Sequence, residues 1–307
     1  MTFFSIIIPC FNEEAHIEKC LLSLNKQTLD RNKYEIIVID NGSTDRSVQI
    51  SRNLSDQLYI ESDLKVGGVR NFGASKAKGN YLIFIDADCT LDNSWLERAK
   101  EFFETNGSWV VFGGGCSLPP SPVWIEKYWL LEGANGSSLP KDLIGCSIGI
   151  SRVLFEKLGG FNSSLLSGED SELSRRIKLT GKNIIISNKF NVMHWGNARS
   201  QIDFIKRQVW HAQSYKKNIK NNFRDPVFIL ILCFSLSFLT SITLFLISVQ
   251  LGIFALIASM AIPATLTVKR YKRSFRKPEN MLEPIKSYYI DLLYIISRII
   301  GLILRSK

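Results

Sequence analysis

Two carboxylates follow an apolar run at residues 81–85, and their spacing is the strongest chemical signal in the chain. The run ends in Asp86-Ala87-Asp88. On an extended backbone, side chains at positions i and i+2 point to the same side, so both acids would face one site. In an open α/β sheet, ligands bind beyond the carboxyl ends of the strands. The pair therefore favours a divalent cation that also contacts phosphate oxygens, although two acids at a solvated strand end would look the same.

Two other apolar runs also end in polar residues. One leads into Pro9–Glu14 and the other into Asp40–Asp45. The segment Gly67–Ala74 adds flexible backbone and one guanidinium, that of Arg70. Three strand ends and an arginine that converge on two carboxylates would form a site for a nucleoside diphosphate. A redox dinucleotide site would instead need G-x-G-x-x-G after the first strand, where this chain has Pro9-Cys10-Phe11-Asn12.

The elements that must position these residues alternate along residues 1–190. Short, β-branched apolar runs predict strands at 4–9, 34–40, 57–61, 81–86, 109–113, 146–150 and 184–187. A first helix is predicted from the spacing of Ile17, Cys20, Leu21 and Leu24, with Glu13 and Glu14 at its start. A second helix should begin after Ser43, with Asp45 in its first turn. Fully apolar strands that alternate with helices predict an α/β domain with a mainly parallel sheet.

Two further places could carry chemistry. Gly168-Glu169-Asp170 opens a predicted helix whose Leu173 and Ile177 share a face. Acids at a helix N-terminus are stabilised by the helix dipole in any case, so their presence alone does not require catalysis. His194 follows the last predicted strand, and a single histidine is more often a hydrogen-bonded structural residue than a metal ligand.

Residues 226–268 contain no charged side chain, and this length predicts two membrane spans at about 227–248 and 252–268, with a turn near Gln250–Gly252. The flanking clusters are basic: Lys206, Arg207, Lys216, Lys217, Lys220 and Arg224 before the spans, and Lys269, Arg270, Lys272, Arg273, Arg276 and Lys277 after them. Basic flanks on both sides place both ends of the hairpin in the cytoplasm. A buried pair of soluble helices would expose a polar face, which this stretch lacks.

Residues 285–304 are apolar but interrupted by Lys286, Asp291 and Arg298. A third span would bury these charges at a cost of about 3 kcal/mol each, so an amphipathic helix lying on the membrane surface is expected. The net charge of +10 also belongs to this end: residues 1–200 carry −1 and residues 201–307 carry +11. A basic flank beside an apolar span indicates a membrane protein and no nucleic-acid partner.

The six cysteines, Cys10, Cys20, Cys89, Cys116, Cys146 and Cys233, show no paired spacing. They are expected to be reduced core residues, with no disulfide or zinc framework. The apolar run at residues 3–8 is cut by Pro9, so it predicts a strand and no export signal.

Taken together, these motifs closely resemble family 2 of the inverting nucleotide-sugar glycosyltransferases, which have a GT-A type fold. The resemblance covers about residues 4–200. It rests on Ile8–Glu13, Asp40–Asp45, Arg70–Gly73, Asp86–Asp88, Gly159–Phe161, Gly168–Asp170 and His194.

The resemblance implies a role for each of these residues. Pro9, Phe11, Glu13, Asp40 and Asn41 would line the nucleotide pocket, Arg70 would approach the base or the diphosphate, and Asp86, Ala87 and Asp88 would meet the diphosphate and its Mg²⁺ or Mn²⁺. Asp86, Asp88 and His194 would be the metal ligands, and Asp170 the catalytic base with Glu169 next in line. The family often has a second aspartate where this chain has Asn41, whose amide both accepts and donates, so a uracil base is favoured but not fixed.

The sequence thus predicts a membrane-anchored inverting glycosyltransferase with a cytoplasmic site and a UDP-sugar donor. Its location near lipid suggests a lipid-linked acceptor such as a polyprenyl phosphate glycan. The expected parts are a catalytic domain at 1–200, a basic linker at 201–225, two spans at 226–268, and a basic segment with an interfacial helix at 269–307. Two alternatives stay open at this point: a nucleotidyltransferase of similar architecture, and a membrane-tethered module that binds a nucleotide or lipid phosphate without catalysis.

Overall fold

A computed structural model describes residues 2–132, 139–213, 215, 222–223 and 225–304 of the chain. The chain divides into two compact units. The N-terminal unit comprises residues 1–121 and 136–197, and the C-terminal unit comprises residues 122–135 and 198–307. The segment 122–135 therefore belongs with the C-terminal helices, although it lies within the first 200 residues of the sequence.

The N-terminal unit is built on a seven-stranded sheet in the order β3-β2-β1-β4-β8-β6-β9. Its strands are β1 (Phe4–Cys10), β2 (Tyr34–Asp40), β3 (Gln57–Ile60), β4 (Tyr81–Phe84), β6 (Val111–Gly113), β8 (Ile148–Ser151) and β9 (Ile184–Ile186). Only β8 runs antiparallel to its neighbours in this sheet. The predicted α/β fold with a mainly parallel sheet is confirmed, and each predicted strand is present with small differences at its ends.

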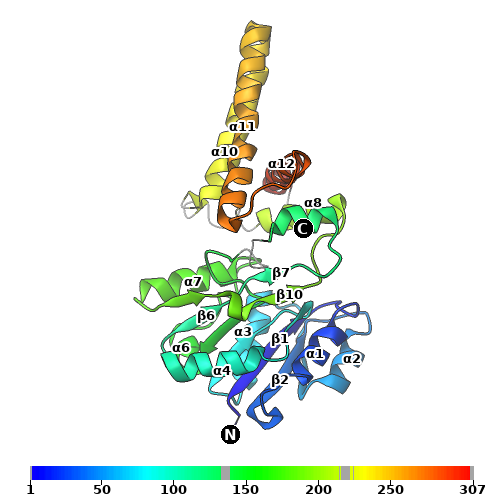
Figure 1. Cartoon of the computed structure of the whole chain (residues 1–307), viewed down its shortest axis with the longest axis vertical. Coiled ribbons are helices and arrows are strands. Elements are labelled where there is room, and N and C mark those ends of the chain that lie inside the picture. The colour runs from blue at the N-terminus through cyan, green and yellow to red at the C-terminus, as the bar shows by residue number, and fades with distance from the viewer. Residues whose placement is uncertain (1, 133–138, 214, 216–221, 224, 305–307) are drawn as a thin grey trace. The chain divides into compact units, whose positions relative to one another are not determined.

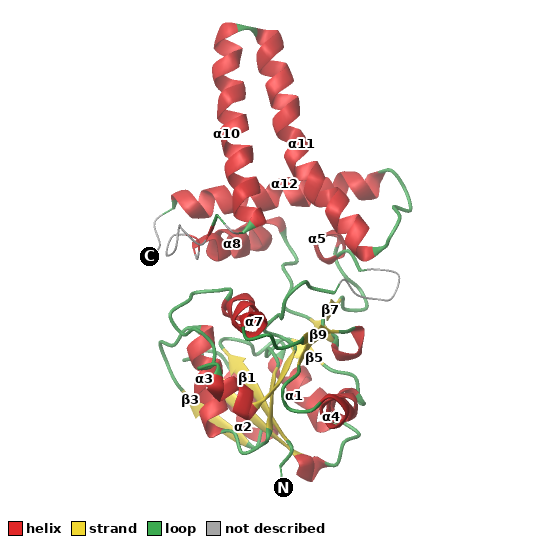
Figure 2. Cartoon of the chain, turned by 90° about the vertical axis from the view of Figure 1, so that its left-hand side faces the viewer, coloured by secondary structure: helices red, strands yellow, loops and turns green. Residues whose placement is uncertain are grey.

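Helices cover both faces of this sheet (Figure 1 and Figure 2). They are α1 (Ile17–Asn25), α2 (Ser47–Leu54), α3 (Val66–Lys76), α4 (Trp95–Asn106), α6 (Arg152–Lys157) and α7 (Glu169–Leu179), with 3-10 turns at η1 (Arg31–Lys33) and η2 (Asn188–Phe190). Alternate residues of a strand point to opposite faces, so Ile6 and Ile8 enter the core under α1 and α4. Ile7 enters the second core, with residues of α3, α6 and α7.

The first helix begins at Ile17 and buries Ile17, Cys20, Leu21 and Leu24, as their spacing predicts. The prediction for the second helix was wrong at its start. That helix, α2, begins at Ser47, so Asp45 precedes it. The Oδ1 atom of Asp45 accepts a hydrogen bond from the Ser47 backbone N–H at 2.9 Å. Asp45 therefore forms the turn that leads into the helix and is not part of its first turn.

A second, three-stranded sheet was not predicted. It consists of β5 (Cys89–Thr90), β10 (Val192–His194) and β7 (Cys116–Ser117), in the order β5-β10-β7. The pairing of β5 with β10 is antiparallel and places His194 opposite Cys89. Strands of two or three residues are too short to carry a periodic pattern, so the sequence does not predict them.

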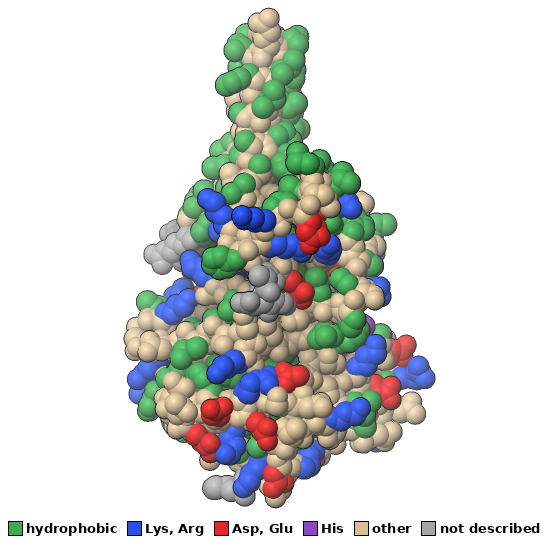
Figure 3. Space-filling model, viewed as in Figure 1, with side chains coloured by type: hydrophobic (Ala, Val, Ile, Leu, Met, Phe, Trp, Pro, Cys, Tyr) green, Lys and Arg blue, Asp and Glu red, His purple; other side chains and the backbone are tan. Residues whose placement is uncertain are grey.

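The C-terminal unit contains five helices among its described residues: α5 (Trp124–Leu130), α8 (Gln201–Ala212), α10 (Pro226–Ile247), α11 (Val249–Ser274) and α12 (Leu282–Ile303). Both α10 and α11 are long and apolar enough to cross a membrane. Hydrophobic side chains cover the visible face of this hairpin (Figure 3). The hairpin turns at Ser248, slightly before the predicted Gln250–Gly252, and Gly252 lies inside α11, where a side chain would overlap the Phe245 ring.

The segment expected to be a basic linker begins with helix α8, which buries Phe204, Gln208 and Ala212. Lys216, Lys217, Lys220 and Arg224 of the predicted basic flank lie outside the described residues. Helix α12 matches the predicted amphipathic segment and lies across the base of the hairpin (Figure 2). Its polar residues Glu283, Ser287 and Asp291 face the interior of the unit.

Candidate active site

The carboxylate of Asp88 lies next to His194. The Oδ2 atom of Asp88 is 3.5 Å from Nε2 of His194, which is 7% exposed. The two residues meet because β5, which starts directly after Asp88, pairs with β10 in the register that sets Cys89 opposite His194. The Trp195 backbone N–H donates to the Asp88 carbonyl oxygen at 2.9 Å, and this bond holds the end of β10 against the start of β5. Any side chain at Gly196 would overlap the Asp88 carboxylate, so glycine is required there.

These residues fit a divalent cation. Ligand atoms of Asp88, Cys89 and His194 all lie within 4.8 Å of one another, and this is the one such group found among the described residues. The Nδ1 atom of His194 is buried and has no hydrogen-bond partner among the residues that the structure describes. Burial raises the pKa of the Cys89 thiol well above its usual value, and the thiol donates to Oδ1 of Asp88 at 3.5 Å. A carboxylate and an imidazole, with a neutral thiol that donates to the carboxylate, suit Mg²⁺ or Mn²⁺.

Arg70 is the buried centre of the site. It comes from α3 and its side chain is 3% exposed. One terminal nitrogen donates to Oδ1 of Asp86 at 2.6 Å, and the other donates to Glu169. Asp86 and Glu169 raise the pKa of the guanidinium above its usual value against the opposing effect of burial. Both terminal nitrogens of Arg70 thus donate to carboxylates of the protein, and the expected contact of Arg70 with the base or the diphosphate stays a prediction.

The two acids of the Gly168-Glu169-Asp170 turn have different surroundings. Gly168 adopts a φ of +80°, and α7 begins at Glu169. Glu169 is 5% exposed and is paired with Arg70. Asp170 accepts instead from backbone N–H groups, that of Gly145 at 3.0 Å and that of Ser171 at 2.6 Å. Burial, followed by the charge of Glu169, raises the pKa of Asp170 to about 6. Asp170 is thus the acid suited to accept a proton near neutral pH.

Asp40 lies at the carboxyl end of β2 and is 1% exposed. Its Oδ1 atom accepts from the backbone N–H groups of Gly42 at 3.0 Å and Ser43 at 2.8 Å. Its Oδ2 atom is buried and has no hydrogen-bond partner among the described residues. A buried carboxylate oxygen without a donor is costly, so this atom indicates a place for a ligand N–H.

The other expected nucleotide contacts lie at the same edge of the sheet. Phe11 follows β1 directly and is 57% exposed. Pro9 is half-buried within β1, and the backbone N–H of Glu13 donates to Ser47 Oγ at 2.8 Å. Ala87 is buried between Asp86 and Asp88.

The Asn41 amide forms two hydrogen bonds with the backbone of Leu64. Its Nδ2 donates to the Leu64 carbonyl oxygen at 2.8 Å, and its Oδ1 accepts from the Leu64 backbone N–H at 3.1 Å. The side chain therefore ties the end of β2 to the loop before α3. The expected place of Asn41 beside the base stays a prediction, and the unpartnered Oδ2 of Asp40 is a further candidate acceptor.

Sequence reasoning missed Gly145 and Gly196. Gly145 contacts both Asp170, through its N–H, and the Arg70 guanidinium, which a side chain at this position would overlap. Each glycine stands in an irregular segment, next to Cys146 and Trp195 respectively. Nothing in such a segment marks a close approach of distant parts of the chain.

The geometry of acids, arginine and histidine at the carboxyl edge of the sheet agrees with the comparison to known proteins. Residues 5–159 match the profile of the family described as "Glycosyl transferase family 2". The chain belongs to this family. It is a glycosyltransferase, and its family includes enzymes of glycan and polysaccharide synthesis.

Three relatives illustrate the range of this transferase family. The glycosyltransferase AglE of Haloferax volcanii is 28% identical over 68% of this chain and 71% of its own length. The succinoglycan biosynthesis protein ExoA of Rhizobium meliloti is 25% identical over 71% of this chain and 69% of its own length. The poly(ribitol-phosphate) beta-glucosyltransferase of Bacillus spizizenii is 33% identical over 45% of this chain, which matches only 20% of that longer protein.

Solved structures share the GT-A type fold of this transferase. The mannosyltransferase PcManGT of Pyrobaculum calidifontis, solved with GDP-Man and Mn²⁺, aligns with a TM-score of 0.62 over 97% of this chain and 86% of its own, at 18% identity. The S. aureus TarS structure with UDP-GlcNAc aligns with a TM-score of 0.51 over 97% of this chain and 90% of its own, at 18% identity. These likenesses confirm the predicted fold.

Proposed function

We propose that this protein is a membrane-anchored inverting glycosyltransferase that moves a sugar from a nucleoside diphosphate donor, a UDP-sugar, to a lipid-linked acceptor. The proposal rests on one arrangement above all. Arg70 joins Asp86, beside the Asp88–His194 pair, to Glu169, which adjoins Asp170. A cation-binding pair and a carboxylate with a pKa of about 6 are thereby connected through one buried arginine.

The donor base is proposed to bind at the ends of β1 and β2. The unpartnered Oδ2 of Asp40 would accept the imide N–H of uracil, and the exposed ring of Phe11 offers an apolar face beside it. Guanine also carries an N–H at the corresponding edge. A comparison of UDP-sugars with GDP-sugars as donors distinguishes the two bases.

The diphosphate is proposed to lie near Asp88 and His194, which would hold Mg²⁺ or Mn²⁺. The cation would neutralise the charge that develops on the departing diphosphate. Arg70 has a different part in this scheme. It balances the charges of the buried Glu169 and the partly exposed Asp86, so that the two acids can stay close together.

Asp170 is proposed to remove the proton from the acceptor hydroxyl as that oxygen attacks the anomeric carbon opposite the leaving group. The bond to the diphosphate breaks as the new bond forms, and this inverts the anomeric centre without a covalent enzyme intermediate. Glu169 is tied to Arg70, so we assign it a positioning role.

The exposed apolar side chains of the C-terminal unit support anchoring in a membrane. In α12 the apolar residues Leu282, Ile285, Tyr289, Ile296, Ile300 and Ile303 are exposed and share one face of the helix. On the opposite side, Asp291 is fully buried and accepts from Thr267 and Arg270. A helix with its polar face inside and its apolar face outside suits contact with lipid. We propose that α10 and α11 cross the membrane and that α12 lies on its cytoplasmic surface.

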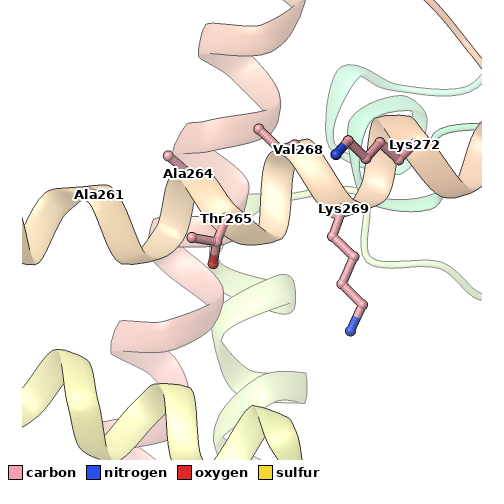
Figure 4. A pocket seen from close by; sticks show the side chains of 6 residues that line it. All are labelled: Ala261, Ala264, Thr265, Val268, Lys269 and Lys272. Atoms are coloured by element: carbon pink, nitrogen blue, oxygen red, sulfur yellow. The ribbon is translucent and has the colours of Figure 1, made fainter.

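A groove on α11 supports a phosphate-headed lipid as a partner. It has a volume of about 450 Å³ and is lined by Ala261, Ala264, Thr265, Val268, Lys269 and Lys272 (Figure 4). Neither Lys269 nor Lys272 has an ion-pair partner among the described residues, whereas the nearby acids Asp291 and Glu283 are paired with Arg270 and Arg276. An apolar groove that ends at two lysines matches a lipid chain with a phosphate head.

The donor is tested with the full-length protein in lipid nanodiscs. UDP- and GDP-sugars are supplied with Mn²⁺ or with EDTA, and release of the nucleoside diphosphate is measured together with product formation on polyprenyl phosphate. We expect turnover with a UDP-sugar, only with the metal, and only when Asp170 is present. Turnover with GDP-sugars alone would overturn the choice of base, and turnover in EDTA would overturn the metal.

The lipid partner is tested by binding the protein to vesicles with and without an added lipid phosphate. The variant K269Q/K272Q should bind the lipid phosphate more weakly. K78Q/K100Q, which removes two lysines of the N-terminal unit, serves as the matched control. Equal losses in both double variants would mean that total charge, and not this groove, recognises the lipid.

A further inference from the structure

Three cysteines that are far apart in the sequence meet beside the candidate site. The sulfur atoms of Cys116 and Cys146 are 3.4 Å apart, and Cys146 also forms a hydrogen bond with Cys89. The sequence led us to expect reduced core cysteines; the structure has all six free and brings three of them together. No step of the proposed transfer reaction uses these thiols.

Cys116 and Cys146 lie in two different segments, one next to the proposed base Asp170 and the other next to the proposed metal ligand His194. Cys146 directly follows Gly145, whose N–H donates to Asp170 at 3.0 Å. Cys116 belongs to β7, which pairs with β10 at Val192, two residues before His194. A covalent link between the two sulfurs would therefore join the segment that holds the proposed base to the strand that carries the proposed metal ligand.

We propose that Cys116 and Cys146 are a redox modification site, oxidised by hydrogen peroxide to a disulfide that slows sugar transfer. Cys116 is partly exposed and gives the peroxide access to the pair. One of the two sulfurs, as the thiolate, attacks a peroxide oxygen, the O–O bond breaks, and a sulfenic acid and one water form. The other sulfur then attacks the sulfur of the sulfenic acid, the S–S bond forms, and the second water leaves. The two thiols lose two electrons and two protons in all, and the peroxide is reduced to two waters.

The disulfide must draw two side chains together beside the site. Bonded sulfur atoms are about 2.05 Å apart, so the two thiols must approach by more than 1 Å from their present 3.4 Å. Gly145 is packed against the Arg70 guanidinium and can yield little on that side. The hydrogen bond from Gly145 to Asp170 is the contact most directly strained. Because Gly145 contacts Asp170 directly, whereas Asp40 and the proposed base pocket are not part of this segment, kcat should fall more than donor affinity.

The test uses the full-length protein in nanodiscs, treated with hydrogen peroxide and then with a thiol-alkylating reagent. Mass spectrometry should show two fewer free thiols and a peptide that links Cys116 to Cys146. Turnover should fall roughly 10- to 100-fold, with donor KM little changed, and dithiothreitol should restore it. C116S and C116A should retain basal activity and resist peroxide, while C233S, which removes an exposed cysteine of α10, should respond like the unmodified chain.

Three results would overturn the proposal: a linkage to any other cysteine, an unchanged kcat in protein with the mapped disulfide, or equal peroxide sensitivity in C116S. The mass measurement does not depend on the donor or the acceptor. An error in the proposed donor therefore leaves the disulfide test intact.

Discussion

The backbone N–H of Gly145 donates to Oδ2 of Asp170 at 3.0 Å, and this contact defines where the proposed base stands. The other oxygen of Asp170 accepts from Ser171. With both oxygens oriented by backbone groups, the carboxylate cannot turn toward Arg70, which is occupied by Glu169 and Asp86. Two adjacent acids thus take different roles because they have different hydrogen-bond donors.

Replacing Gly145 should disturb this arrangement directly. A side chain there would overlap the Arg70 guanidinium, which is held by two ion pairs and cannot move aside freely. We expect G145A to lower the free energy of unfolding by about 1–3 kcal/mol and to lower kcat. Chemical denaturation and steady-state kinetics measure the two effects. G68A is the matched control, since a side chain at Gly68 in α3 makes ordinary contacts, and it should be neutral or stabilising.

Asp170→Asn should separate binding from chemistry. The amide keeps the shape of the carboxylate but cannot accept the proton, so donor affinity should persist while turnover falls by about 10²–10⁴. Calorimetry and single-turnover assays measure the two quantities. E172Q, on the same helix and paired with Arg175 and Arg176, should retain normal turnover. Near-normal turnover in D170N would assign the base elsewhere, with Glu169 the next residue to test.

The pH profile should report the same residue. The pKa of Asp170 is raised to about 6, so its carboxylate, the form that accepts a proton, dominates above pH 6 and is lost as the pH falls below it. We expect log(kcat/KM) to decline with a slope of about one below pH 6 and to be level above it, until another group titrates. A profile without this acid limb would contradict the assignment. In D170N, the residual activity should lack the inflection.

The metal site predicts different results for the two acids of Asp86-Ala87-Asp88. D88A and H194A should lose Mn²⁺-dependent donor binding with the fold intact, because both side chains lie at a strand end. D86A should also lower thermal stability, since it leaves the buried Arg70 with one acid fewer. Calorimetry with and without EDTA, together with melting curves, distinguishes these outcomes. E104Q, at an exposed ion pair with Lys100, is the control. If neither EDTA nor the D88A substitution changed donor binding, the proposed metal site would be excluded.

Topology can be tested by reporter fusions at Gln250, next to the turn at Ser248, and at Lys307. If α10 and α11 form a spanning hairpin, the two reporters should lie in opposite compartments, with Lys307 in the cytoplasm. The basic residues in the last turns of α11 and directly after it favour this orientation by about 1 kcal/mol each near an anionic leaflet. Reporters in one shared compartment would mean that the hairpin does not cross the membrane.

The sequence by itself determined the strands of the seven-stranded sheet, the acids at the strand ends and the apolar hairpin. These features follow from local periodicity and from the length of apolar runs. Both are properties of residues that are close together in the sequence, so they do not depend on the rest of the chain. The convergence of Asp40 and Asp86 at one edge could also be inferred, since parallel strands end on the same side of a sheet.

Tertiary structure alone decided which partner each polar group took. Asp88 meets His194 only through the pairing of two very short strands, Asn41 is tied to Leu64, and Arg70 is committed to Asp86 and Glu169. The contact between Cys116 and Cys146 has the same origin. Hydrogen bonds and ion pairs depend on distances of about 3 Å between groups that packing brings together, and no local pattern encodes those distances.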